Sequence, residues 1–198
     1  NGSKITVNDI NFKGTVQTFM LGHYKNGTYN NFNTELNNVN IIGVNVVSFS
    51  SYISPAVAVY GNATLNNVNI YGTKLSNYDT DPMWPVYDLA AVNYTNTVVN
   101  GGKIGTIYTW HHANMELNDV EVDSILSNTT HTKGGRLVIG DGTTVGTIKA
   151  NYATKIAITI KSGATVDTLD LSMVSNLDSC DIVIEDGATV KNIIYNEQ

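Results

Sequence analysis

The sequence predicts an all-β protein, a single-domain parallel β-solenoid of about eight coils. Three observations support this fold class: a strand–turn–strand phrase repeated near the C-terminus, a related frame repeated in the N-terminal half, and the repeat lengths. The C-terminal phrase occupies residues 137–148, 158–169 and 182–193. Each copy alternates apolar and polar residues on both sides of a turn, which is the pattern of strands with one face turned inward.

The spacing of the C-terminal copies favours a solenoid over other repeat folds. The copies begin at Leu137, Ile158 and Ile182. A repeat of this length without a helical period suits one coil of a solenoid, whereas a propeller blade needs about 40–45 residues. A glycine marks the turn of each copy, at Gly142, Gly163 and Gly187. We expect these turns to use the positive φ that glycine tolerates.

The N-terminal half repeats a second sequence pattern, which we call the frame. Its positions are, in order, an apolar residue, Asn, a second Asn or an Asp, an apolar residue, any residue, and an apolar residue. The three-residue step between the first two apolar positions breaks strict alternation. We therefore expect a bend at the Asn pair, because Asn and Asp tolerate the left-handed conformation. In-register stacking would place Asn67 over Asn38 at about 4.8 Å and allow their amides to form a ladder. Coil starts are predicted at Val7, Leu36, Leu65, Val99, Leu117, Leu137, Ile158 and Ile182.

The Leu-Asn-Asn-Val-x-Ile-x-Gly frame of residues 36–43 and 65–72 resembles the coils of right-handed parallel β-helix proteins, the pectate-lyase-like superfamily. Among these, the chain is most similar in character to bacterial cell-surface, adhesin-type members. The resemblance covers most of the chain as architecture and implies a right-handed coil. It implies little about activity, since this fold carries lyases, hydrolases, phage tailspikes and adhesins.

The predicted coils become shorter along the chain, because the starts from Val7 to Val99 are spaced more widely than those from Val99 to Ile182. The whole chain, 1–198, is expected to be one solenoid domain, excised from a larger protein. It would have longer-looped coils over 1–112 and regular short coils over 113–198. Because stacked strands cannot absorb extra residues, the surplus is expected to leave one flank as loops. Three segments hold most of it: 23–32, 49–60 and 77–88.

The composition narrows the classes of partner. The 198 residues carry a formal charge of −6 and one arginine, Arg136, which argues against a nucleic-acid partner. No run of 18 apolar residues occurs, so no membrane insertion is expected. The one cysteine, Cys180, is expected to be a small buried thiol. The Asn/Thr bias with only 14% charged residues is typical of secreted or wall-attached bacterial proteins, and we expect an extracellular monomer without a cofactor.

Aromatic and acidic residues around Trp84 form the candidate ligand-binding site. Aromatic rings stack on the apolar C–H face of a sugar, and carboxylates accept its hydroxyls. The alternative is that these rings cover apolar coil surface. The candidate residues are Tyr78, Asp79, Asp81, Trp84, Tyr87, Asp88, Tyr108, Trp110 and His112.

Neither a metal site nor a catalytic site is predicted. His111 and His112 with Asp79 or Asp81 could be drawn as a metal site, but adjacent residues of a strand point to opposite faces. No Gly-x-Ser-x-Gly nucleophile motif occurs. The catalytic motifs of the resembling family cannot be matched to residues of this chain.

Three functions remain open from the sequence. The leading one is a non-catalytic surface module that binds a host glycan or glycoprotein, acts as a rigid spacer in a bacterial adhesin, or does both. The second is a polysaccharide-degrading enzyme, a lyase or glycoside hydrolase, that uses the same flank. The third is a module that binds a host protein such as immunoglobulin, through strand addition or its flat Asn/Thr face.

Overall fold

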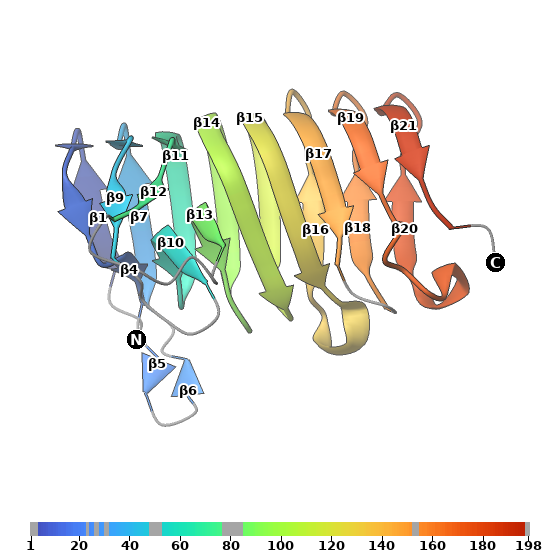
Figure 1. Ribbon diagram of the computed structural model, residues 1–198, viewed down its shortest axis with the longest axis horizontal. Helices are drawn as coiled ribbons and strands as arrows, with labels where there is room; N and C mark the ends of the chain where they lie inside the picture. Colours follow the sequence, from blue (N-terminus) through green and yellow to red (C-terminus); the bar gives the residue numbers. More distant parts are fainter. Residues whose placement is uncertain are drawn as a thin grey trace.

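A computed structural model describes residues 4–22, 24–25, 28–29, 32–47, 53–76, 85–151 and 155–196. Within them the chain forms a parallel β-solenoid of eight stacked coils, as the sequence predicts (Figure 1). Its main sheet has 16 strands. The coils run from β1 at one end to β20 and β21 at the other (Figure 1).

Each coil contributes to three faces. The first face consists, in order, of β1 (Lys4–Asn8), β7 (Asn33–Asn37), the first parts of β11 (Asn62–Tyr71), β14 (Asn96–His111) and β15 (Asn114–Thr129), β16 (Arg136–Ile139), β18 (Ala157–Ile160) and β20 (Asp181–Ile184). The second face consists of β2 (Asn11–Phe12), β8 (Asn40–Ile42), later parts of β11, β14 and β15, and the first parts of β17 (Thr144–Ala150), β19 (Thr165–Asp170) and β21 (Thr189–Ile194). The third face consists of β4 (Phe19–Leu21), β10 (Ser54–Val59), β13 (Val86–Ala91) and the last parts of β14, β15, β17, β19 and β21.

Shorter elements lie beside these faces. The two-residue strands β3 (Thr15–Val16), β9 (Asn45–Val46) and β12 (Lys74–Leu75) form a separate parallel sheet. The strands β5 (Tyr24–Lys25) and β6 (Thr28–Tyr29) form an antiparallel hairpin. Two 3₁₀ turns, η1 (His131–Lys133) and η2 (Leu177–Ser179), lie in later coils. No helix among the described residues has the length and apolar character needed to cross a membrane.

The Asn pair bends the chain as predicted. The second residue of the pair is in the left-handed conformation in four coils, with φ of 54°, 54°, 51° and 56° at Asp9, Asn38, Asn67 and Asp119. The bend keeps the apolar residues on both sides pointing inward, and Leu65, Val68 and Ile70 are fully buried. The three turn glycines also have the predicted positive φ, with values of 70°, 80° and 88° at Gly142, Gly163 and Gly187.

The register confirms that Leu36 and Leu65 stack, and it corrects the last three predicted coil starts. Leu36 pairs with Leu65 on the first face. Leu117 pairs with Ile139 instead of Leu137, and Ile139 continues to Ile160 and Ile184, so the last three coils start two positions later than predicted. A shift of two positions leaves every side chain on the same face of a strand. Alternation alone therefore cannot distinguish the two alignments.

In the second and third coils the surplus residues lie between the second and third faces, whereas segment 23–32 follows β4 of the third face and precedes β7 of the first face. In the third coil the whole segment 71–88 separates the inward residues Ile70 and Leu89, whereas in the fourth only positions 105 and 106 separate Ile104 from Ile107. The prediction that all three segments leave on one flank is therefore wrong for segment 23–32, and residues 48–52 and 77–84 of the other two lie outside the described residues. The expectation that this surplus is all loop is wrong, because β10 and β13 lie within it and stack as strands of the third face.

One apolar core runs through the stack. Buried residues from Leu21 to Val174 form a single cluster, with Cys180 partly buried against it. Each fully buried Leu or Ile contributes about 1.5–3 kcal/mol. Because every coil buries its residues on its neighbours, the core is continuous along the axis of the stack.

Candidate functional site: an aromatic belt at the end of β14

Six rings lie in a chain around the end of β14, which we call the aromatic belt. Successive ring centroids are separated by 5.1 Å (Tyr87–Tyr108), 6.4 Å (Tyr108–Trp110), 5.0 Å (Trp110–His111), 5.9 Å (His111–His112) and 5.0 Å (His112–Tyr94). Four of the six come from β14 and the turn after it. The other two come from β13 and the turn that precedes β14.

One end of the belt is buried. Tyr87 and Tyr108 stack with an interplanar angle of 26°, and both pack in a small cluster with Ile53, Ala90 and Val92. This cluster lies outside the main core, because Leu89 and Ile107 point inward while their neighbours Ala90 and Tyr108 point outward. At this end the alternative interpretation, rings that cover apolar coil surface, describes the geometry. The Tyr108 hydroxyl also accepts a hydrogen bond of 3.1 Å from Nδ2 of Asn128.

Burial favours the neutral form of three side chains in the belt. Burial, with a smaller effect of the neighbouring Tyr108 phenol, raises the pKa of Tyr87 to about 12. Burial also raises the pKa of Tyr108, against the opposing effect of its hydrogen bond from Asn128. The pKa of His111 is lowered by burial, which disfavours the charged imidazolium. All three shifts favour the neutral side chain.

The other end of the belt is open to solvent. Tyr94 is 50% exposed, and Trp110, His111 and His112 are partly exposed. Tyr94 and His111 have left-handed φ values of 58° and 50°, which are uncommon for bulky residues and cost of order 1–3 kcal/mol each. Two such residues on one small surface, both carrying exposed rings, mark this end as the candidate for ligand contact.

Asp88 does not belong to the belt. Its side chain is buried, and its Oδ2 accepts hydrogen bonds from the backbone N–H and the hydroxyl of Thr106, at 2.7 and 3.0 Å. Its Oδ1 accepts from the backbone N–H of Thr73 at 3.0 Å. A buried carboxylate satisfied by three donors ties neighbouring coils together. The predicted role of Asp88 in ligand binding is therefore not supported by its geometry.

The structure brings together four of the predicted site residues: Tyr87, Tyr108, Trp110 and His112. Four others, Tyr78, Asp79, Asp81 and Trp84, lie outside the described residues. Sequence reasoning missed Tyr94 as a ligand-binding candidate and considered His111 only as a metal ligand. The sequence signal for Tyr94 is its position: it lies just before β14, and His112 occupies the corresponding position one coil later.

No group of three or more His, Cys, Asp or Glu that could hold a metal ion occurs in the part of the chain that the structure describes. The His111 and His112 rings are edge-on with an interplanar angle of 70°. Their rings belong to the stacking geometry of the belt, with Trp110 on one side and Tyr94 on the other.

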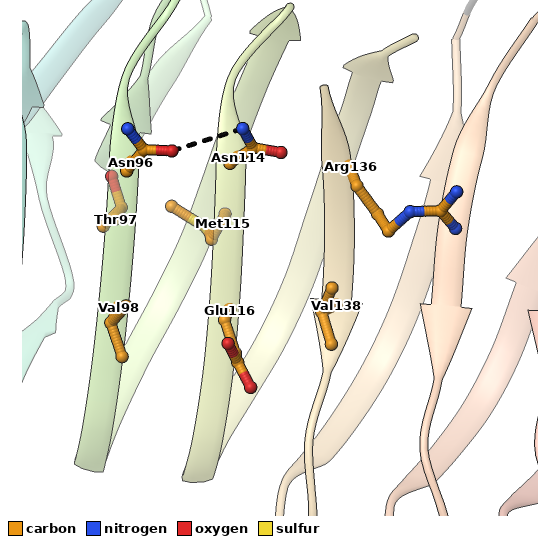
Figure 2. Close-up of a pocket in the computed structure, with 8 residues that line it drawn as sticks. All are labelled: Asn96, Thr97, Val98, Asn114, Met115, Glu116, Arg136 and Val138. Atoms are coloured by element: carbon orange, nitrogen blue, oxygen red, sulfur yellow. Dashed lines mark hydrogen bonds between the residues drawn. The ribbon is translucent and has the colours of Figure 1, made fainter. Parts of the chain in front are cut away.

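A second surface lies on the outer side of the first face, between two ladders of Asn side chains. Figure 2 shows part of it, with the hydrogen bond between Asn114 and Asn96 of one ladder. One ladder contains Asn33, Asn62, Asn96 and Asn114, and the other contains Asn8, Asn37, Asn66, Asn100 and Asn118. Between them Val98, Glu116 and Val138 line a shallow hollow of about 280 Å³. Glu116 pairs with Lys161 at 2.8 Å, and Arg136 points away from Val98 and pairs with Asp181 (Figure 2).

The charges of this hollow are satisfied within the protein, and its amides bond to one another. It therefore offers a ligand few unengaged groups. We take the belt as the candidate functional site.

No protein-family model, no curated protein and no solved structure matches this chain, so the fold and the belt are the grounds on which its function is argued.

Proposed function

We propose that this chain is a non-catalytic module of a bacterial surface adhesin, a member of the right-handed, pectate-lyase-like β-helix superfamily. The protein would be secreted or attached to the cell wall. In this role the solenoid is a stiff spacer, and the open end of the aromatic belt binds a host glycan. The observation that carries the proposal is the solvent-facing ring surface of Tyr94, Trp110 and His112 on a stack of coils.

The chemistry of the belt favours a neutral sugar. An aromatic ring contributes a flat apolar surface that matches the C–H face of a hexose. The formal charge of −6 disfavours strongly acidic glycans by long-range repulsion. The pKa shift of His111 favours its neutral form, which also suits an uncharged ligand.

The rigidity of the scaffold supports binding by pre-organisation. The rings of Tyr108 and Trp110 lie on β14, which pairs with β15 over its full length. Holding rings in place before the ligand arrives reduces the entropy lost on binding. A stiff module also keeps such a site at a fixed distance from its attachment point.

A glycan array with the purified chain tests this proposal. We expect binding to neutral glycans that Trp110→Ala and Tyr94→Ala each weaken about tenfold, the loss of roughly 1.4 kcal/mol of stacking. Tyr195→Ala is the matched control, because Tyr195 is 55% exposed on the last coil, away from the belt. Thermal unfolding of each variant shows whether the fold is retained.

Other outcomes would replace the proposal with one of its alternatives. Equal binding by wild type, Trp110→Ala and Tyr94→Ala would remove the belt as the binding site. Shortened or unsaturated sugar products would indicate a polysaccharide-degrading enzyme. Binding of serum proteins without glycan binding would indicate a host-protein module.

A further inference from the structure

At each end of the described solenoid the terminal strands are paired on one side only, among the strands that the structure describes. β1 and β20 are the terminal strands of the first face. β21 pairs with β19 alone, and β4 with β10 alone, among the described strands. An edge strand of this kind offers a row of backbone donors and acceptors to another chain.

Inward-facing apolar residues are exposed at both ends. Ile184 and Ile193 are 41% and 46% exposed on the last coil, although Ile160 and Leu169, their partners one coil before, are fully buried. Ile5 and Ile10 on the first coil are 54% and 44% exposed. These side chains are exposed because no further described coil stacks on them.

We propose that copies of this chain associate head to tail, with the last coil of one copy stacking on the first coil of the next. The core columns allow this continuation. The column that begins at Val7 ends at Ile184, the column from Phe12 ends at Val190, and the column from Phe19 ends at Ile193. If the two ends stack in register, the last residue of each column in one copy contacts the first residue of the same column in the next copy.

The same register brings opposite charges together. It places Asp181 of one copy opposite Lys4 of the next, because both belong to the row that runs through Asn33, Asn62 and Asn96. Within each copy Lys4 pairs with Glu35, and Asp181 pairs with Arg136. Across the interface the charged side chains would therefore follow the order Glu35, Lys4, Asp181, Arg136, in which negative and positive charges alternate. The register also sets Lys191 opposite Lys13, but Lys191 is already paired with Asp167 at 2.6 Å.

The shape and charge of the ends favour this pairing over a two-fold one. The first coil opens into an apolar hollow of about 320 Å³ lined by Ile5, Val7, Leu21 and Leu36, which can receive apolar side chains. Pairing two last coils would instead bring together the acidic residues Asp181, Glu185 and Asp186 of both copies. A head-to-tail contact uses two different surfaces and does not close, so it generates linear chains of copies. This association replaces the monomer expected from the sequence.

Sedimentation velocity of the full chain over a range of concentrations tests the proposal. Wild type should form a concentration-dependent series of linear oligomers. A tail-blocked variant, Ile184→Lys with Ile193→Lys, and a head-blocked variant, Ile5→Lys with Ile10→Lys, should each remain monomeric. An equimolar mixture of the two variants should form a dimer that grows no further.

Matched controls separate this interface from a general effect of added charge. Val183→Lys with Ile194→Lys adds the same charges to the same strands at 41% and 48% exposed positions, but on outward-facing side chains, and should still associate. Lys4→Glu and Asp181→Lys should each weaken association a few-fold at low salt, and the double reversal should restore it, since an exposed ion pair is weak and is screened by salt. Circular dichroism checks that each variant is folded.

Two results would overturn the proposal. Wild type that stays monomeric up to its solubility limit would show that the ends do not bind each other. A head-blocked variant that still dimerises would show a two-fold contact between last coils instead.

Discussion

Asn67 lies directly over Asn38, and its Nδ2 donates a hydrogen bond of 2.9 Å to Oδ1 of the lower residue. Both are left-handed, with φ of 51° and 54°. Asn38 in turn donates to Oδ1 of Asp9 at 3.0 Å. One side chain thus does two things at each corner: it tolerates the left-handed backbone and it links adjacent coils.

These two roles can be separated by substitution. Asn67→Gly keeps the left-handed backbone but removes the ladder bond, and should lower the free energy of unfolding by about 0.5–1.5 kcal/mol. Asn67→Ala also strains the backbone, and should cost about 1–2 kcal/mol more. Chemical denaturation of both variants measures the difference. An alanine variant as stable as the glycine variant would contradict the assigned corner conformation.

Gly102 is predicted to be intolerant of any side chain. It has φ of 102°, and an added Cβ would lie 2.0 Å from the carbonyl oxygen of Val68 in the coil below. Gly102→Ala should therefore lose more than about 3 kcal/mol of stability, or fail to fold. Gly43→Ala is the control, because Gly43 also has positive φ but has open space at the Cβ position. It should lose only about 1–2 kcal/mol, the cost of the left-handed conformation. Equal losses in the two variants would count against the close coil contact.

The buried carboxylate of Asp88 is predicted to stabilise the fold and not to bind the ligand. Asp88→Asn would turn an N–H group toward donors of Thr73 or Thr106, leaving them unsatisfied, and should cost about 2–4 kcal/mol. Asp123→Asn is the control, because the Asp123 side chain is 61% exposed and should change stability by less than about 0.5 kcal/mol. Glycan affinity measured on the folded fraction should be unchanged in both. A lost affinity in stable Asp88→Asn protein would return this residue to the site.

The stacked tyrosines predict an alkaline limit to stability. The folded-state pKa of Tyr87 is raised to about 12 by burial, above an unfolded value of about 10. The stability that comes from its neutral buried phenol is therefore fully present below pH of about 10 and is lost as pH rises toward 12. Phenolate absorbance during titration should show a late group of tyrosines that ionise together with unfolding. In Tyr87→Phe this late group should shrink. If all tyrosines ionised near pH 10 without unfolding, the buried end of the belt would be misplaced.

The coils, the corner and the ladder could be predicted because their signals are local. The alternation of apolar and polar residues indicates a strand with one buried face, and the Asn pair indicates the bend. The strands β10 and β13 could not be predicted, because nearly all of their residues are buried on both sides and show no alternation. Pro55 in β10 also favours a loop.

The candidate site was predictable only in part. The sequence places aromatic residues near one another because the coil length returns the chain to the same corner. It does not show which rings are covered: Tyr87 and Tyr108 are buried, while Tyr94 is open. The role of Asp88 depends on Thr73 and Thr106, which come from adjacent coils. Such contacts between distant residues follow from the register and not from the local pattern.

Distances between spin labels on one outward-facing row test the stacking of coils most directly. The row contains Thr6, Thr64, Val138 and Val183. Labelled cysteines would be placed in pairs in a Cys180→Ser background, diluted with unlabelled protein. With about 4.8 Å per coil, Thr6 to Val138 and Thr64 to Val183 each span five steps and should both give about 24 Å, and Thr6 to Val183 should give about 34 Å. Distances that do not rise with the number of coils, or unequal values for the two five-step pairs, would contradict the parallel solenoid on which the proposed spacer, belt and end-to-end association depend.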